Sequence, residues 1–218
     1  MLIGVLALQG DYGTHAEALT EIGVKSVEIR RPEDAGFLNP KAPRYTRKQE
    51  AGEGKPLIRE SDREAVLRPV PDGLILPGGE SSTIDLLGRR YGLDFLMSAF
   101  AASGKILFGT CAGAIWLGKG EHHKVTPLGL IDVDVERNAY GRQLDSFIEP
   151  INVRGLDEPF EAVFIRAPKF TRIGPGVEVI AEHNGDPVLV RQRNIWLATF
   201  HPERTADRRL HQMIFQQM

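Results

Sequence analysis

The chain has 218 residues, of which 42% are hydrophobic and 26% are charged. This length and composition fit one soluble globular domain, with or without an elaboration, that buries a sizeable core. The formal net charge of −2 offers no electrostatic reason to expect nucleic acid or an anionic membrane as a partner. No apolar run is long enough to span a bilayer.

The chain contains a single cysteine, Cys111, which rules out an internal disulfide framework. A reducing cytoplasm is the simplest compartment for such a chain, and only one thiol is available for chemistry. Residues 2–8 form a short apolar run without a basic lead or a small-residue cleavage site. We therefore predict a buried first strand there rather than a signal peptide.

The first part of the chain alternates strand and helix patterns. A helix is predicted over residues 15–22, where apolar side chains recur at helical spacing, and a second strand follows at about 27–29. This order predicts a right-handed parallel unit. The pattern then stops, because residues 32–71 are rich in Pro, Gly and charged side chains. We interpret about 33–71 as a charged surface insertion, and the residues leave open a partner-docking role for it.

Regular patterns return at residue 73. The further strands predicted are 73–77, 105–109, 130–135, 148–153, 162–166, 177–182, 188–191 and 195–199. The further helices begin near residue 82, where hydroxyl side chains are available as N-caps, and cover 93–102, the stretch after 110 up to 117, and 206–217. This order indicates a three-layer α/β sandwich with a mostly parallel central sheet and antiparallel strands late in the chain.

The strongest motif is Gly109-Thr110-Cys111-Ala112-Gly113, which has the Gly-x-nucleophile-x-Gly form of an elbow between a strand and a helix. The sharp turn requires small side chains two residues from the nucleophile. The free N–H groups of the helix N-terminus would stabilise a thiolate on Cys111. The N–H of Ala112 would point to a tetrahedral oxyanion. The alternative is an inert buried cysteine in a glycine-rich turn.

The second motif, His201-Pro202-Glu203, directly follows the apolar strand predicted at 195–199. His201 therefore lies at the carboxyl end of a strand, the edge at which sites form in open α/β sheets. Histidine can take a proton from a thiol and return it to a leaving amine. Glu203, held by the rigid Pro202, can fix the tautomer of His201. Alone the motif is weak, since a histidine at a strand end is more often structural.

The third motif is Pro77-Gly78-Gly79-Glu80-Ser81, in which two glycines after a buried strand let the backbone approach a ligand. The N–H of Gly79 is a candidate second oxyanion donor, and a simple glycine turn is the alternative. His122 and His123 have no carboxylate or cysteine at ligand spacing, so no metal site is predicted. No dinucleotide or P-loop motif is present in the sequence.

Together these motifs resemble the class I, triad-type glutamine amidotransferases, whose fold is flavodoxin-like. More narrowly, the chain is similar to the glutaminase subunits of the two-protein pyridoxal 5'-phosphate synthases. The stretches that carry this resemblance are 3–10, 76–83, 135–143 and 164–168. Since the resemblance covers nearly the whole chain except the charged insertion, residues 1–218 are expected to form a single glutaminase domain.

The resemblance implies hydrolysis of L-glutamine to L-glutamate and ammonia, with Cys111 as the nucleophile, His201 as the proton carrier and Glu203 as its support. The substrate-binding residues implied are Gly79, Glu80, Ser81, Arg137, Ile165 and Arg166. An arginine fork can pair with the substrate α-carboxylate; without the resemblance, Arg137 and Arg166 would be interpreted as surface charge.

The resemblance also implies a partner, a (β/α)₈-barrel synthase subunit that receives the ammonia and makes pyridoxal 5'-phosphate. That compound is the product of the complex, so no cofactor is expected in this subunit.

Three alternatives remain open from the sequence. The first is a class I glutaminase subunit of another synthase, of the imidazole glycerol phosphate type, which pull-down of the partner would reveal. The second is a non-catalytic regulatory docking module, in which a glutamine-like electrophile would not alkylate Cys111. The third is a cysteine peptidase of similar fold, against which the two arginines favour a free amino-acid carboxylate.

Overall fold

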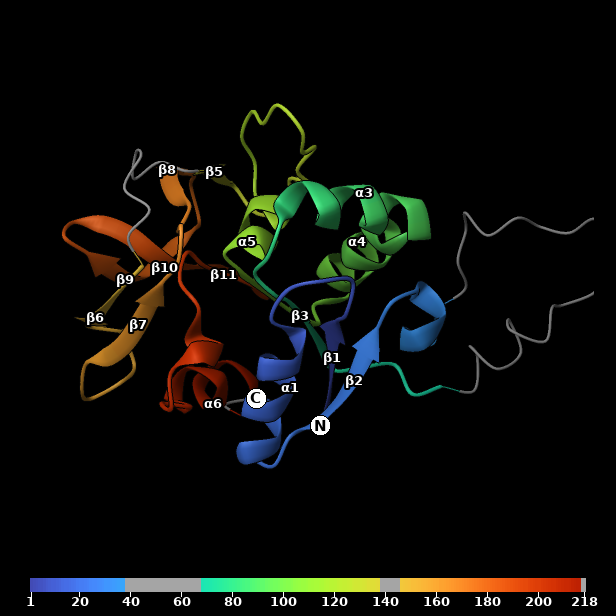
Figure 1. The fold of residues 1–218 in the computed structure, drawn as a ribbon, viewed down its shortest axis with the longest axis horizontal. Helices are drawn as coiled ribbons and strands as arrows, with labels where there is room; N and C mark the ends of the chain where they lie inside the picture. The colour runs from blue at the N-terminus through green and yellow to red at the C-terminus, as the bar shows by residue number, and fades with distance from the viewer. Residues whose placement is uncertain (38–67, 138–145, 217–218) are drawn as a thin grey trace, which may run out of the picture.

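The computed structural model describes residues 1–37, 68–137 and 146–216, so most of the predicted insertion lies outside the described residues. Its centre is a seven-stranded sheet in the order β2-β1-β3-β4-β11-β10-β9 (Figure 1). The parallel strands are β1 (Leu2–Leu6), β2 (Lys25–Ile29), β3 (Gly73–Leu76), β4 (Ile106–Thr110) and β11 (Ile195–Ala198). The antiparallel strands are β10 (Asp186–Gln192) and β9 (Glu178–His183).

Helices cover both faces of this sheet, which confirms the three-layer prediction (Figure 1). On one face lie α1 (Tyr12–Glu21) and α6 (Arg209–Phe215); on the other lie α3 (Ser81–Tyr91), α4 (Leu93–Ser103) and α5 (Ala112–Leu117). Successive side chains of a strand point to opposite faces, so Ile75 joins the α1 and α6 core while Leu74 and Leu76 join the other. This two-sided burial explains why the central strands are continuous apolar runs.

Two small antiparallel sheets complete the described chain: β5 (Val133–Glu136) with β8 (Lys169–Ile173), and β6 (Phe147–Ile151) with β7 (Phe160–Phe164). Single turns of 3-10 helix form at η1 (Pro32–Ala35) and η2 (Pro202–Arg204). None of the helices in the described ranges is long and apolar enough to cross a membrane.

Several predicted elements differ from the structure in detail. The strand β8 was not predicted, because its exposed side chains break up the apolar pattern. The first strand is shorter than predicted and ends at Leu6, and the closing helix begins later than predicted, at Arg209. The prediction of a hydroxyl side chain as the N-cap of α3 is wrong. The N-cap is Glu80, whose carboxylate accepts a hydrogen bond from the Ser82 backbone N–H.

The segment before residue 38 packs against the domain, although the sequence analysis assigned residues from about 33 to the charged insertion. Ala35 is fully buried, and the ring of Phe37 lies 5.6 Å from that of Phe100. At the other end, Arg68 donates to the Asp34 carboxylate at 2.6 Å. The described ends of the insertion therefore lie close together.

Candidate active site

Cys111 lies between β4 and α5 in a strained backbone conformation, with φ 47° and ψ −103°. A positive φ is costly for a residue with a side chain, and such strain persists only where the surroundings enforce it. Here the Cys111 N–H donates to the Ala198 carbonyl at 2.9 Å, and the Cys111 carbonyl accepts from Ile115 at 3.2 Å. The elbow predicted from the sequence is thus tied to β11 behind it and to α5 ahead of it.

The elbow depends on the close approach of α5 to β3. A methyl group on Gly113 would overlap the carbonyl oxygen of Leu76 and lie 2.7 Å from its carbonyl carbon. These are backbone atoms of a central strand, which cannot move aside. Only glycine therefore lets the helix begin directly after Cys111.

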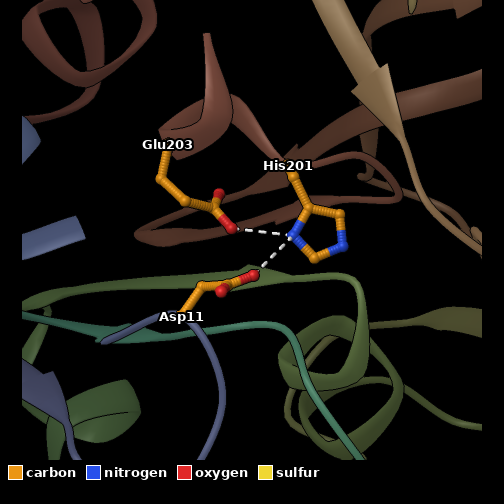
Figure 2. Close-up of side chains that lie close together, drawn as sticks. All are labelled: Asp11, His201 and Glu203. Carbon is orange, nitrogen blue, oxygen red and sulfur yellow. Dashed lines mark hydrogen bonds and ion pairs between the residues drawn. The ribbon is translucent and has the colours of Figure 1, made fainter. Parts of the chain in front are cut away.

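His201 and Glu203 form a buried pair just beyond β11. The Nδ1 atom of His201 lies 2.7 Å from Oε1 of Glu203, and the two side chains are almost entirely buried (Figure 2). The backbone N–H of His201 donates to the Val163 carbonyl at 2.8 Å, which anchors the histidine to β7. Pro202 starts η2 and directs Glu203 back toward the imidazole. The side chain of Glu203 can therefore fix the Nδ1 proton of His201.

Gly78 brings the histidine and the cysteine to the same place. A methyl group on Gly78 would overlap Cε1 of His201 and lie 3.3 Å from Cβ of Cys111, so both side chains border the space that a side chain at 78 would fill. Within the described chain, Nε2 of His201 is buried and makes no hydrogen bond. This nitrogen is available to exchange a proton with a reacting group.

The charges of the pair follow from its surroundings. Burial lowers the pKa of His201, but the Cys111 sulfur and Glu203 raise it more, to about 10. Burial raises the pKa of Glu203, but His15 and His201 lower it more, to about 2. At neutral pH the imidazole is therefore a cation that is stabilised by the Glu203 carboxylate and the sulfur of Cys111.

Asp11 is a site residue that the sequence analysis missed. Its Oδ2 lies 3.6 Å from Nδ1 of His201 (Figure 2), and its carboxylate accepts two bonds from Arg204, at 2.7 and 3.0 Å. Asp11 follows β1 at the carboxyl edge of the sheet, the same signal that pointed to His201. In the described part of the chain, Asp11, His201 and Glu203 form the group with metal-ligand geometry, but the Arg204 guanidinium on Asp11 disfavours a cation there.

The glycine turn after β3 packs on Gln9. The Glu80 N–H donates to Oε1 of Gln9 at 3.0 Å, and Nε2 of Gln9 donates to the Glu80 carbonyl at 3.4 Å. Gly79 is exposed beside this contact, with φ 147°. Ser81 is buried, and its hydroxyl has no partner in the described ranges. A buried hydroxyl without a partner is suited to receive a ligand atom.

The predicted substrate-binding arginines follow two different strands, β5 and β7. Arg137 follows β5 and donates to Oε1 of Glu80 at 2.9 Å, so the structure brings these two predicted residues together. Hydrogen bonds from Ser82 and the charge of Arg137 lower the pKa of Glu80. Ile165 and Arg166 directly follow β7, which bonds to His201 through Val163. Arg166 is exposed and has a strained φ of 44°.

His15 and His211 are buried polar residues behind Glu203 that the sequence analysis assigned no role. His15 lies three and four residues before the buried Ala18 and Leu19 of α1, so helical spacing would have placed it on the inner face. Its contact with Glu203, however, joins two segments from opposite ends of the sequence and depends on the tertiary structure.

Residues 54–218 match the SNO glutamine amidotransferase family. Over 213 residues, the chain is 43% identical to a pyridoxal 5'-phosphate synthase subunit PdxT of Thermus thermophilus, covering 96% of this chain and 94% of that protein. It is also 43% identical to the subunit PdxT of Natronomonas pharaonis, with 97% of both chains covered.

Solved structures show the same relationship. The crystal structure of a glutamine amidotransferase aligns with a TM-score of 0.78 and 40% identity, covering 98% of this chain and 97% of that chain. The PurLQS structure from Thermotoga maritima aligns with a TM-score of 0.61 over 99% of this chain and 97% of that chain. At 16% identity this second similarity shows the fold alone.

Proposed function

This chain belongs to the SNO glutamine amidotransferase family, and from that membership we propose that Cys111 hydrolyses L-glutamine to L-glutamate and ammonia. The chain is the glutaminase subunit of pyridoxal 5'-phosphate synthase, since it belongs to this family and its relatives are named as subunit PdxT of that synthase. The observation that carries the proposal is the elbow cysteine beside the His201–Glu203 pair, with His201 and Cys111 both bordering the space that the missing side chain of Gly78 leaves.

In the first half of the reaction the Cys111 thiolate attacks the side-chain amide carbon of glutamine. The carbonyl oxygen becomes an oxyanion, which the N–H groups of Ala112 and Gly79 stabilise. Ala112 is the first residue of α5, so its N–H has no partner four residues back in the helix. His201 then gives its Nε2 proton to the departing nitrogen, and ammonia leaves a thioester on Cys111.

In the second half, water attacks the thioester. Nε2 of His201, now neutral, takes a proton from the water, and the thioester breaks to release glutamate and restore the thiolate and imidazolium. Glu203 keeps the other imidazole proton on Nδ1 throughout, so Nε2 alone takes part in proton transfer.

Recognition of free glutamine depends on its two charged groups. Glu80 and Arg137 form an ion pair of 2.9 Å, which offers a carboxylate for the substrate ammonium and a guanidinium for its carboxylate. Gly79, Ser81, Ile165 and Arg166 complete the proposed glutamine site. A peptide lacks this pair of charges on the residue attacked, which favours a free amino acid as substrate.

The partner is the synthase subunit of the same complex, and we propose that it is a (β/α)₈ barrel. Ammonia passes to it through protein, since in bulk water it would be protonated and lose its nucleophilicity. We place this complex in the cytoplasm, because the chain has a single cysteine and that cysteine is a nucleophile which must remain reduced.

The proposal is tested by ammonia release from glutamine, measured with and without the barrel subunit for the wild type and Cys111→Ala. We expect release by the wild type in the complex and a loss of several orders of magnitude in the variant. Comparable ammonia release from Cys111→Ala and the wild type would overturn the proposal. If only a synthase of the imidazole glycerol phosphate type activated ammonia release, the proposed partner would be wrong and the proposed hydrolysis of glutamine would stand.

A further inference from the structure

Behind the triad, four side chains form one continuous buried chain. His201 contacts Oε1 of Glu203; Nε2 of His15 lies 3.2 Å from Oε2 of the same carboxylate; and Nδ1 of His15 lies 3.1 Å from Nε2 of His211. His15 and His211 are fully buried and come from α1 and α6, on the face of the sheet that carries both helices. Phe108 presents its ring to both imidazoles at 6.3 Å.

Burial favours the neutral form of both imidazoles. Burial lowers the pKa of His15, and burial together with the neighbouring His15 lowers the pKa of His211 to about 3. Their charged neighbours act in both directions: Glu203 and Asp11 favour the cation on His15, while His201 and Arg208 oppose it. Arg208 approaches this group through its bond to the Glu203 carbonyl at 3.2 Å. The hydrogen-bond partner of Nε2 of His15 is the hydroxyl of Thr110, at 3.3 Å, whereas Oε2 of Glu203, 3.2 Å from the same nitrogen, has no hydrogen bond within the described ranges.

Neutrality decides where each proton lies. Glu203 is ionised and only accepts, so Nε2 of His15 must carry a proton if Oε2 is to have a donor. Nδ1 of His15 is then bare and needs a proton from Nε2 of His211. This leaves Nδ1 of His211 bare, and in the described ranges that atom is buried without a hydrogen-bond partner. A bare acceptor without a partner costs less than a buried N–H without one.

We propose that His15 is a positioning residue for the triad, and that His211 keeps His15 in the tautomer that donates to Glu203. In this tautomer the Nε2–H group of His15 lies 3.2 Å from Oε2 of Glu203, the oxygen that has no hydrogen-bond partner in the described ranges, while Nδ1 of His201 bonds to Oε1. The carboxylate cannot rotate away from His201, and it resists protonation at acidic pH. The expected effect on activity rests on the proposed glutaminase reaction. The contacts of His15 and His211 do not depend on any substrate.

The direct test is NMR of the full-length wild-type chain with ¹⁵N-labelled histidine, assigned with His15→Gln and His211→Gln. We expect His15 and His211 to be neutral and protonated on Nε2 at pH 7 and above. A protonated Nδ1 on His15, or a His15 cation in this range, would overturn the proposal. This result does not depend on ammonia release, so failure of the proposed function would be recognised separately.

The kinetic test compares His15→Leu with His15→Gln in the complex with the synthase subunit. Glutamine at 15 keeps an N–H donor near the position of Nε2, whereas leucine has a similar size and no donor. We expect kcat of the leucine variant to be at least about tenfold lower than that of the wild type, with KM within about twofold. We also expect the acid limb of its pH–activity profile to shift to higher pH. Glutamine should restore most of both.

Thermal unfolding of each variant provides the control for a purely structural effect. Equal kcat and equal acid-side profiles for the leucine and glutamine variants, whatever their unfolding temperatures, would contradict a positioning role. His211→Gln and His211→Leu give a second pair, because only glutamine retains a donor toward Nδ1 of His15. We expect the leucine variant of this pair to lose activity in the same direction.

Discussion

At the scale of single residues, the site is defined by the charges that its buried groups carry. His201 has a pKa raised to about 10 and Glu203 one lowered to about 2, so both are ionised between these values. In the proposed reaction, the imidazolium of His201 already carries the proton that the leaving ammonia needs.

The raised pKa of His201 makes stability depend on pH. A group whose pKa is raised in the folded state stabilises the fold fully below its unfolded value of 6.5, and this contribution is lost as the pH rises through about 10. The free energies of unfolding of the wild type and His201→Gln, measured in urea, should therefore differ most near pH 6. This difference should be smaller by a few kcal/mol above about pH 10. His123→Gln, at an exposed position, serves as the control. A pH-independent difference would contradict the ionised state assigned to His201.

Glu203 has a role separate from that of a charge. In Glu203→Gln the amide can still occupy the space of the carboxylate. It no longer holds the proton of His201 on Nδ1, and it no longer stabilises the imidazolium cation. We expect kcat to fall on the order of 10²- to 10⁴-fold with little change in KM. Ammonia release measures this loss, and Glu178→Gln, at an exposed ion pair, is the matched control. Activity of Glu203→Gln close to that of the wild type would remove Glu203 from the triad.

At the scale of elements, the elbow depends on how closely α5 approaches β3. The strained φ of Cys111 is enforced by hydrogen bonds to β11 and α5, and glycine at 113 lets the helix reach the Leu76 backbone. The nucleophile is therefore positioned by the packing of a helix on a sheet.

A matched pair of glycine substitutions tests this. Gly113→Ala should lower the free energy of unfolding by at least about 2 kcal/mol and reduce kcat, because its methyl group would overlap the Leu76 backbone. Gly13→Ala, in the exposed part of α1 with no atom within 4 Å of its methyl group, should be neutral or stabilising by about 0.5–1 kcal/mol. Urea unfolding compares the two, and a tolerated Gly113→Ala would show that the helix can shift.

At the scale of the whole molecule, the parallel sheet gathers the site from distant parts of the chain. Asp11 follows β1, Gly78 follows β3, Cys111 follows β4 and His201 lies just beyond β11, all at the carboxyl edge of neighbouring strands. The charged insertion falls between the first two of these strands in sequence position. The motifs flank it, and we propose that it takes no part in the chemistry.

Replacing residues 38–67 by a short flexible linker tests that proposal. The 2.6 Å ion pair between Asp34 and Arg68 shows that the ends are near enough for about eight Gly and Ser residues to join them. We expect alkylation of Cys111 by a glutamine-like electrophile, and ammonia release without partner, to stay within about threefold of the wild type. A large loss of alkylation in a folded variant would place the insertion in the catalytic machinery, and loss of activation alone would assign it to docking.

The sequence by itself determined the three layers, the elbow at Cys111 and the pairing of His201 with Glu203 as a hypothesis. These features have local signals: apolar runs that need burial, glycines that a sharp turn requires, and a rigid proline between two chemical groups. The tertiary structure alone decided that Glu80 caps α3 and pairs with Arg137, that Asp11 lies beside His201, and that His15 lies between Glu203 and His211. Those contacts join residues far apart in the chain, and which side chains meet depends on strand order and helix packing, which no local pattern specifies.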